Sequence, residues 1–141
     1  MNWQTEIVSR LKDYDAARSA ATTLQGEVER LQAMINSPGT ARTDIPVKSG
    51  KNREDWLIGQ MLLLDETVLR LELTRRWLES MDRAFSMLNP EEKLVLHRLY
   101  ICPQKSSLDR LCAELGAERS TVYRKRDAAL RHLTTALCGP M

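Results

Sequence analysis

Two long segments carry apolar residues at heptad spacing, and this pattern constrains the fold more than any other feature of the chain. In residues 5–36, apolar side chains recur every seven residues, with a second set at intermediate positions. The two sets are Ile7, Tyr14, Ala21, Val28 and Ile35, and Ala17, Leu24 and Leu31. A stripe this narrow predicts a long helix that packs against one or two partner helices.

A second long helix is predicted over residues 52–88, with Asn52 as its N-cap. Its apolar residues form two stripes that we expect to lie side by side: Leu57, Met61, Leu64, Val68, Leu71, Leu78 and Phe85, and Ile58, Leu62, Leu69, Leu73, Trp77 and Met81. The first helix can cover one stripe as an antiparallel partner, but the other requires the C-terminal module or a second copy of the chain. An intramolecular hairpin and a dimerising bundle are therefore both open.

The segment between the two helices, residues 37–51, contains two Pro and two Gly and has no apolar periodicity, so we predict a loop. Residues 1–88 are accordingly assigned to a two-helix hairpin domain that serves oligomerisation or partner binding.

Residues 89–141 are predicted to form a compact set of shorter helices. Asn89-Pro90-Glu91-Glu92 is a strong helix start, and that helix should continue through Tyr100 and end before Pro103. Ser106 and Asp109 have the spacing of a capping box for the next helix, which should end at Gly116. A final helix is expected over residues 119–137. The chain is thus predicted to be all-α, with a long antiparallel, coiled-coil-like hairpin followed by a small helix-turn-helix domain.

Residues 107–133 have the pattern of a helix-turn-helix motif, with a tight turn through Gly116 and Ala117. The apolar residues that should face inward are Leu108, Leu111, Cys112 and Leu115 on the first helix, and Val122, Ala129, Leu130 and Leu133 on the second. In such motifs the N-terminal part of the second helix enters the major groove of DNA. The candidate DNA-binding residues on or near the outer face are Arg119, Ser120, Thr121, Tyr123, Arg124, Lys125 and Arg126.

The distribution of charge agrees with this assignment. Residues 1–88 hold 12 basic and 13 acidic side chains, a balance of −1, whereas residues 89–141 hold 9 and 6, a balance of +3. The basic excess therefore lies in the segment that carries the motif, as binding to a polyanion requires.

Residues 88–135 resemble region 4 of the bacterial sigma-70 factors. The matching positions are Leu88, Glu92, Val95, Leu96, Leu115, Gly116, Val122, Ala129, Leu130 and Leu133. The resemblance implies that Arg119, Ser120, Thr121 and Arg124 read DNA. Glu118 departs from the family pattern, which has a capping Ser or Thr at that position. The whole layout is similar to small phage transcription regulators of the ArpU/RinA type, which implies action at late phage operons.

These observations predict a sequence-specific, DNA-binding transcriptional regulator of phage or prophage origin. The expected partners are double-stranded DNA and a second copy of the chain bound through the hairpin, with RNA polymerase as a further candidate. A small terminase-like DNA-packaging protein and an RNA polymerase-binding adaptor without DNA contact are the alternatives. A ring of many subunits would indicate the packaging protein, whereas a monomer or dimer would indicate the regulator. Salt-insensitive or absent DNA binding would indicate the adaptor.

Other classes of protein receive no support from the residues. There is no phosphate-binding loop, no nucleophile–base arrangement and no paired carboxylate site, so we expect neither an enzyme nor a cofactor. The spacing of His97, Cys102, Cys112 and His132 fits no zinc pattern, so no metal is expected. The first residues do not form a signal peptide, the apolar run at residues 56–64 is too short to span a bilayer, and the three cysteines are an odd number without CxxC spacing. We therefore expect a cytoplasmic protein with small buried thiols and no membrane contact.

Overall fold

The computed structural model describes residues 2–36 and 50–140, and within these ranges the chain consists of helices joined by short turns, with no β-strand. The elements are α1 (Trp3–Asn36), α3 (Gly50–Ser86), α4 (Pro90–Leu96), η1 (His97–Ile101), α5 (Ser107–Leu115) and α6 (Arg119–Cys138). The chain divides into two compact units. Unit 1 comprises Met1–Arg18 and Trp77–Met141, and unit 2 comprises Ser19–Arg76.

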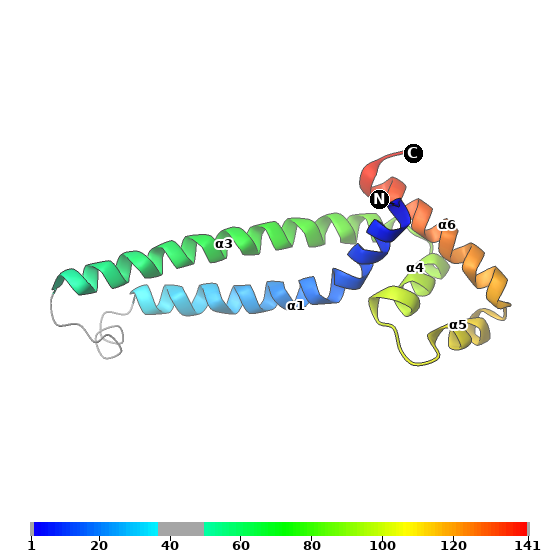
Figure 1. Cartoon of the computed structure of the whole chain (residues 1–141), viewed down its shortest axis with the longest axis horizontal. Helices are drawn as coiled ribbons and strands as arrows, with labels where there is room; N and C mark the ends of the chain where they lie inside the picture. The colour runs from blue at the N-terminus through cyan, green and yellow to red at the C-terminus, as the bar shows by residue number, and fades with distance from the viewer. Residues whose placement is uncertain (1, 37–49, 141) are drawn as a thin grey trace. The chain divides into compact units, whose positions relative to one another are not determined.

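In unit 2, the second part of α1 packs against the first part of α3 (Figure 1). The buried residues at this contact include Val28 and Leu31 of α1 and Leu71 of α3. Across the same contact, Arg75 Nη2 donates a hydrogen bond to Gln25 Oε1 at 2.5 Å. The predicted packing of the two long helices against each other is confirmed.

Helix α3 begins earlier than predicted. Its first residue is Gly50, so Asn52 lies inside the helix and the prediction of Asn52 as the N-cap is wrong. The predicted loop at residues 37–51 lies outside the described residues, except for its last two positions, which are helical.

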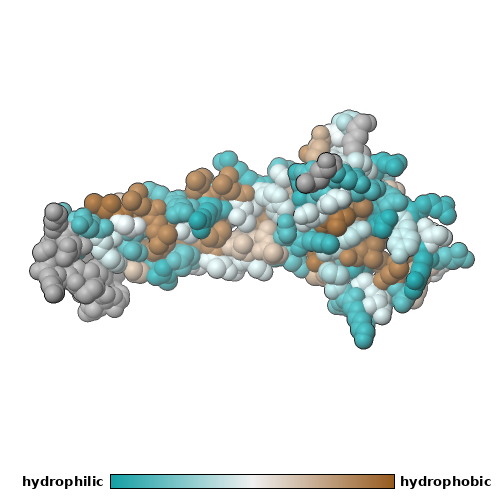
Figure 2. Space-filling view, in the orientation of Figure 1, coloured by the Kyte–Doolittle hydropathy of each residue, from teal (hydrophilic) through white to brown (hydrophobic). Residues whose placement is uncertain are grey.

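The second apolar stripe of α3 has different surroundings along its length. Its C-terminal members, Trp77 and Met81, pack into the core of unit 1. Its N-terminal members in unit 2 are exposed: Ile58, Leu62, Leu69 and Leu73. Apolar side chains are accordingly visible at the surface of unit 2 in Figure 2. The expected side-by-side arrangement is wrong here, because Leu69 and Leu71 are two residues apart and therefore point to nearly opposite sides of a helix.

Unit 1 is organised around one large apolar cluster. The cluster joins the first turns of α1, the end of α3, α4, η1 and α6: Ile7, Leu11, Tyr14, Met81, Ala84, Leu88, Leu96, Ile101, Ala129, Leu130 and Leu133. Tyr14 also makes ring contacts with Trp77 and Phe85, with centroids 6.4 and 6.3 Å apart. The predicted domain boundary at residue 88 therefore falls inside unit 1, and residues 1–18 belong to the same unit as the helix-turn-helix segment.

Helix α4 begins at the predicted Asn89-Pro90 start, where Asn89 and Glu92 form a capping box. Asn89 Oδ1 accepts a hydrogen bond from the Glu92 amide at 2.7 Å, and Glu92 Oε1 accepts one from the Asn89 amide at 3.2 Å. After Leu96 the helix widens into the π-helical turn η1, where the Cys102 amide donates to the His97 carbonyl at 2.9 Å. The predicted continuation to Tyr100 is therefore helical, but with a wider final turn. Among the described residues, no helix is long and apolar enough to cross a membrane.

Candidate nucleic-acid interface

A compact apolar cluster holds α4, α5 and α6 together at the candidate interface. Val95, Leu111 and Val122, one from each helix, are all fully buried. The side chains packed around them include Leu108, Cys112, Leu115 and Ala117. The predicted inward face of α5 is thus confirmed, and Val122 fixes which side of the first turns of α6 faces the other two helices.

The turn between α5 and α6 depends on Gly116. This residue has φ 61° and ψ 37°, the left-handed conformation that glycine adopts most readily. The next amide, that of Ala117, donates to the Cys112 carbonyl at 3.0 Å and closes the end of α5. The predicted helix end at Gly116 is confirmed.

The start of α5 differs from the prediction. Ser106 is the N-cap residue, but its side chain makes no capping hydrogen bond and its backbone is left-handed, with φ 62°. Ser107 Oγ instead accepts a hydrogen bond from the Gln104 amide at 2.7 Å and donates one to the Gln104 carbonyl at 2.6 Å. The predicted capping box of Ser106 and Asp109 is therefore wrong, because the neighbouring serine supplies the local hydrogen bonds.

Helix α6 begins without a side-chain cap. Glu118 is its N-cap residue, in extended conformation, and makes no capping hydrogen bond. The first amides of a helix have no partner within the helix and lie at the positive end of its dipole. The beginning of α6 therefore offers backbone donors, with an exposed carboxylate beside them.

The seven predicted interface residues divide into two groups by exposure. Four are exposed: Arg119, Ser120, Tyr123 and Arg124. Three are half-buried: Thr121, Lys125 and Arg126. The exposed group belongs to the first two turns of α6, the part that enters the groove in helix-turn-helix proteins.

Within the exposed group, the two arginines differ in their contacts. Arg119 Nη2 donates to Asp109 Oδ1 at 2.7 Å, and this hydrogen bond raises the pKa of Arg119 above its ordinary value. Arg124 has no hydrogen-bond or ion-pair partner within the described part of the chain. Arg124 can therefore bind a ligand without losing an existing contact. Arg119 must first break its hydrogen bond with Asp109.

The half-buried cations have partners within the protein. Lys125 Nζ forms an ion pair with Glu91 of α4. Arg126 donates from Nε and Nη2 to Asp127 Oδ1 at 3.0 and 2.8 Å, and its guanidinium carbon lies 4.9 Å from the centre of the Tyr123 ring. These contacts hold both side chains against unit 1 rather than extended into solvent.

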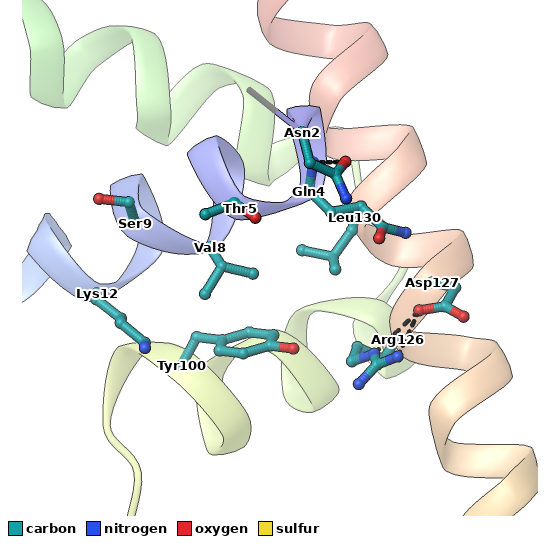
Figure 3. Close-up of a pocket in the computed structure, with 10 residues that line it drawn as sticks. All are labelled: Asn2, Gln4, Thr5, Val8, Ser9, Lys12, Tyr100, Arg126, Asp127 and Leu130. Carbon is teal, nitrogen blue, oxygen red and sulfur yellow. Dashed lines mark hydrogen bonds and ion pairs between the residues drawn. The ribbon is translucent and has the colours of Figure 1, made fainter.

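Arg126 also lines an open pocket of about 410 Å³ within unit 1 (Figure 3). Residues of α1, η1 and α6, and Asn2 just before α1, surround it: Asn2, Gln4, Thr5, Val8, Ser9, Lys12, Tyr100, Arg126, Asp127 and Leu130. Burial raises the pKa of Tyr100 in this pocket, although the nearby charge of Arg126 acts in the opposite direction. Arg126 therefore faces the junction of α6 with α1 and η1.

Comparison with known proteins does not assign the chain to a family. No protein-family model matches it, and searches of curated proteins and solved structures find no significant match. The interpretation of the interface therefore depends on the residues and geometry described above.

Arg131 has the properties of a site residue but is not in the predicted set. It is exposed on α6 and follows Arg124 by seven residues, which places the two side chains within about 20° of each other around the helix. That spacing was readable in the sequence, but Arg131 lies beyond the short segment that the motif singles out.

The cysteines are less buried than predicted. Cys102 and Cys112 are half-buried and Cys138 is exposed, so the expectation of buried thiols is wrong. Cys102 Sγ donates a hydrogen bond to Asp15 Oδ2 at 2.8 Å, and this bond raises the pKa of the thiol.

Among the described residues, no group of three or more His, Cys, Asp and Glu side chains could hold a metal ion.

Proposed function

We propose that this chain is a sequence-specific, double-stranded DNA-binding regulator that acts at promoters through the helix-turn-helix formed by α5 and α6. One observation carries the proposal. The first turns of α6 bury Val122 against α4 and α5 and expose Arg119, Ser120, Tyr123 and Arg124. An exposed, basic and hydroxyl-rich helix start on a three-helix support with a buried apolar core has the form of a recognition helix.

The exposed side chains suit distinct roles on DNA. Arg124 can pair with the acceptors of guanine in the major groove, and Ser120 can reach a base edge or a phosphate. Arg119 joins them when phosphate or base replaces Asp109, an exchange that costs little because both partners of this ion pair are exposed to solvent. Lys125 and Arg126 are assigned to phosphate contact and to positioning of α6, respectively.

The resemblance to sigma-70 region 4 and to ArpU/RinA-type regulators supports a phage or prophage origin, a cytoplasmic location and RNA polymerase as a further partner. A homodimer would present two recognition helices to paired half-sites, the arrangement that most helix-turn-helix regulators use.

The experiment that tests the proposal is a pull-down of fragments from the source genome with the purified full chain, sequenced at two salt concentrations. We expect enrichment of one or a few sites upstream of an operon, and this enrichment should survive the higher salt. Capture of all DNA that disappears at the higher salt would contradict sequence specificity, since phosphate contacts alone are strongly salt-dependent. Recovery of no DNA would contradict DNA binding itself.

Substitution of Arg124 then tests whether the proposed face of α6 makes the contact. Arg124→Ala should weaken binding to the recovered site by about 1–3 kcal/mol and bind unrelated DNA nearly as well as the parent protein. Arg83→Ala is a matched control, because Arg83 is also exposed but lies beside Ala136 and Leu137, at the opposite end of α6. An equal loss on every DNA sequence would assign Arg124 to a phosphate instead of a base.

A further inference from the structure

Unit 2 carries an apolar stripe on the side of α3 that faces away from α1. The stripe, called the outer stripe here, consists of Ile58, Leu62, Leu69 and Leu73, which are 56%, 64%, 55% and 56% exposed. Leu71, on the opposite side of the same helix, is 4% exposed because it packs in the hairpin contact. Helix α3 is thus apolar on two opposite faces, and only one of them is covered by the described residues of unit 2.

The sequence of the outer stripe is symmetric about its centre. Counting from the centre between Asp65 and Glu66, apolar residues occur at the same distances in both directions: Leu62 and Leu69, then Ile58 and Leu73. An exposed acid, Asp55, lies three residues before Ile58 at one end of the stripe. An exposed base, Arg76, lies three residues after Leu73 at the other end. All six side chains lie within about 60° of the helix circumference.

We propose that the outer stripe binds the outer stripe of a second copy of this chain, with the two α3 helices antiparallel about a two-fold axis near Asp65 and Glu66. In this arrangement Ile58 of one copy faces Leu73 of the other, and Leu62 faces Leu69. Each Asp55 faces the Arg76 of the other copy, so the dimer contains two such charge pairs. The contact extends from residue 55 to residue 76, about 32 Å along the helix.

The charges select this orientation over the parallel one. A parallel, in-register pair would place Asp55 against Asp55 and Arg76 against Arg76, and like charges in facing positions are destabilising. The antiparallel pair replaces both repulsions with attractions. The same argument favours a second copy over an unrelated partner, because a surface that is complementary to itself is what a two-fold interface requires.

The centre of the stripe limits the strength of this dimer. Asp65 of one copy lies near Glu66 of the other, and Glu66 is bonded to Arg70 of its own helix at 2.6 Å. Two facing acidic pairs at the axis weaken the contact, so removal of the Asp65 charge should tighten it.

Sedimentation equilibrium of the full chain without DNA tests the proposal, and its result does not depend on whether the chain binds DNA. We expect a monomer–dimer equilibrium. Leu62→Glu should weaken dimerisation about 100-fold or more, because each dimer would then bury two carboxylates against leucine. Leu63→Glu is the matched control: Leu63 is also exposed, at 41%, but points about 100° away from Leu62. Equal effects of the two variants, or a parent protein that stays monomeric at high concentration, would overturn the proposal.

Charge reversal tests the antiparallel orientation. Asp55→Arg and Arg76→Asp should each raise the dissociation constant about tenfold, since each places two like-charge pairs in the dimer. The double variant Asp55→Arg/Arg76→Asp should restore the parent value, because every pair is again of opposite charge. Failure of the double variant to recover would exclude the antiparallel register. Asp65→Asn should lower the dissociation constant, and a higher value would place the axis elsewhere.

Discussion

Arg119, the first residue of α6, is tied to Asp109 in the first turn of α5 by a hydrogen bond of 2.7 Å. The two side chains are 65% and 62% exposed, so the bond joins the two helices of the motif at their solvent side. A cation that the sequence marks for DNA is therefore neutralised by its own domain in the absence of a ligand.

Asp109→Asn should increase affinity for DNA if the proposed function is correct, because it releases Arg119 and removes a carboxylate next to the start of α6. The free energy of unfolding should change little, because an exposed ion pair contributes little to stability. Fluorescence anisotropy with a labelled duplex measures the affinity. Asp13→Asn makes the same change of net charge at an exposed position of α1. If it raises affinity equally, the effect is one of net charge and not of Arg119.

Glu118→Ser should raise the free energy of unfolding by about 0.5–1 kcal/mol, because serine can cap α6 where glutamate makes no capping bond. It should also increase DNA affinity by removing an exposed negative charge. Glu118→Gln separates the two effects, since it removes the charge without supplying a good cap. Urea denaturation and DNA titration of both variants provide the measurements. Equal stabilisation by glutamine would refute the capping explanation.

Ser106→Gly should stabilise the protein by about 0.5–1 kcal/mol, because Ser106 has φ 62° and glycine adopts this conformation without the steric cost. Ser107→Gly should have the opposite effect, since it removes both hydrogen bonds to Gln104 and weakens the first turn of α5. Thermal denaturation of the pair compares them directly. Destabilisation by both substitutions would show that Ser106 contributes more than its backbone conformation indicates.

Asp15→Asn should accelerate alkylation of Cys102 at pH 8. The carboxylate of Asp15 accepts a hydrogen bond from the thiol and so raises its pKa, which reduces the fraction of reactive thiolate. Without that carboxylate the pKa falls towards its ordinary value and the thiolate fraction rises. Mass spectrometry after a short exposure to iodoacetamide measures the rate, and Cys138, which is exposed, is the internal reference. An unchanged ratio of Cys102 to Cys138 modification would contradict this account.

The sequence was informative wherever structure is determined locally. The helix start at Asn89 and the helix end at Gly116 follow from side-chain or backbone chemistry within a few residues, and both are confirmed. The cap at Ser106 was wrong because two adjacent serines offer the same chemistry, and the sequence does not say which of them turns towards Gln104.

Properties that depend on contacts between residues far apart in the sequence were harder to predict. The heptads of α1 run without a break from Ile7 to Ile35, so nothing in them indicates that residues 1–18 belong to a different compact unit from the rest of the helix. Similarly, Arg124, Lys125 and Arg126 look equivalent in the sequence. The ion pair of Lys125 with Glu91 and the bond of Arg126 to Asp127 distinguish them, and the first depends on how α4 packs beside α6.

The π-helical turn at His97–Ile101 is the place in this part of the chain where one residue can be deleted with the least effect on the core. The hydrogen bond from the Cys102 amide spans five residues, so the turn holds one residue more than an α-helical turn needs. Deleting one residue there would convert the turn to α-helix and leave the angular positions of the later residues in place. The same deletion within α4 would rotate every subsequent side chain of the helix by about 100° and take Val95 or Leu96 out of the core. A difference of one residue between this chain and its relatives is therefore expected at η1.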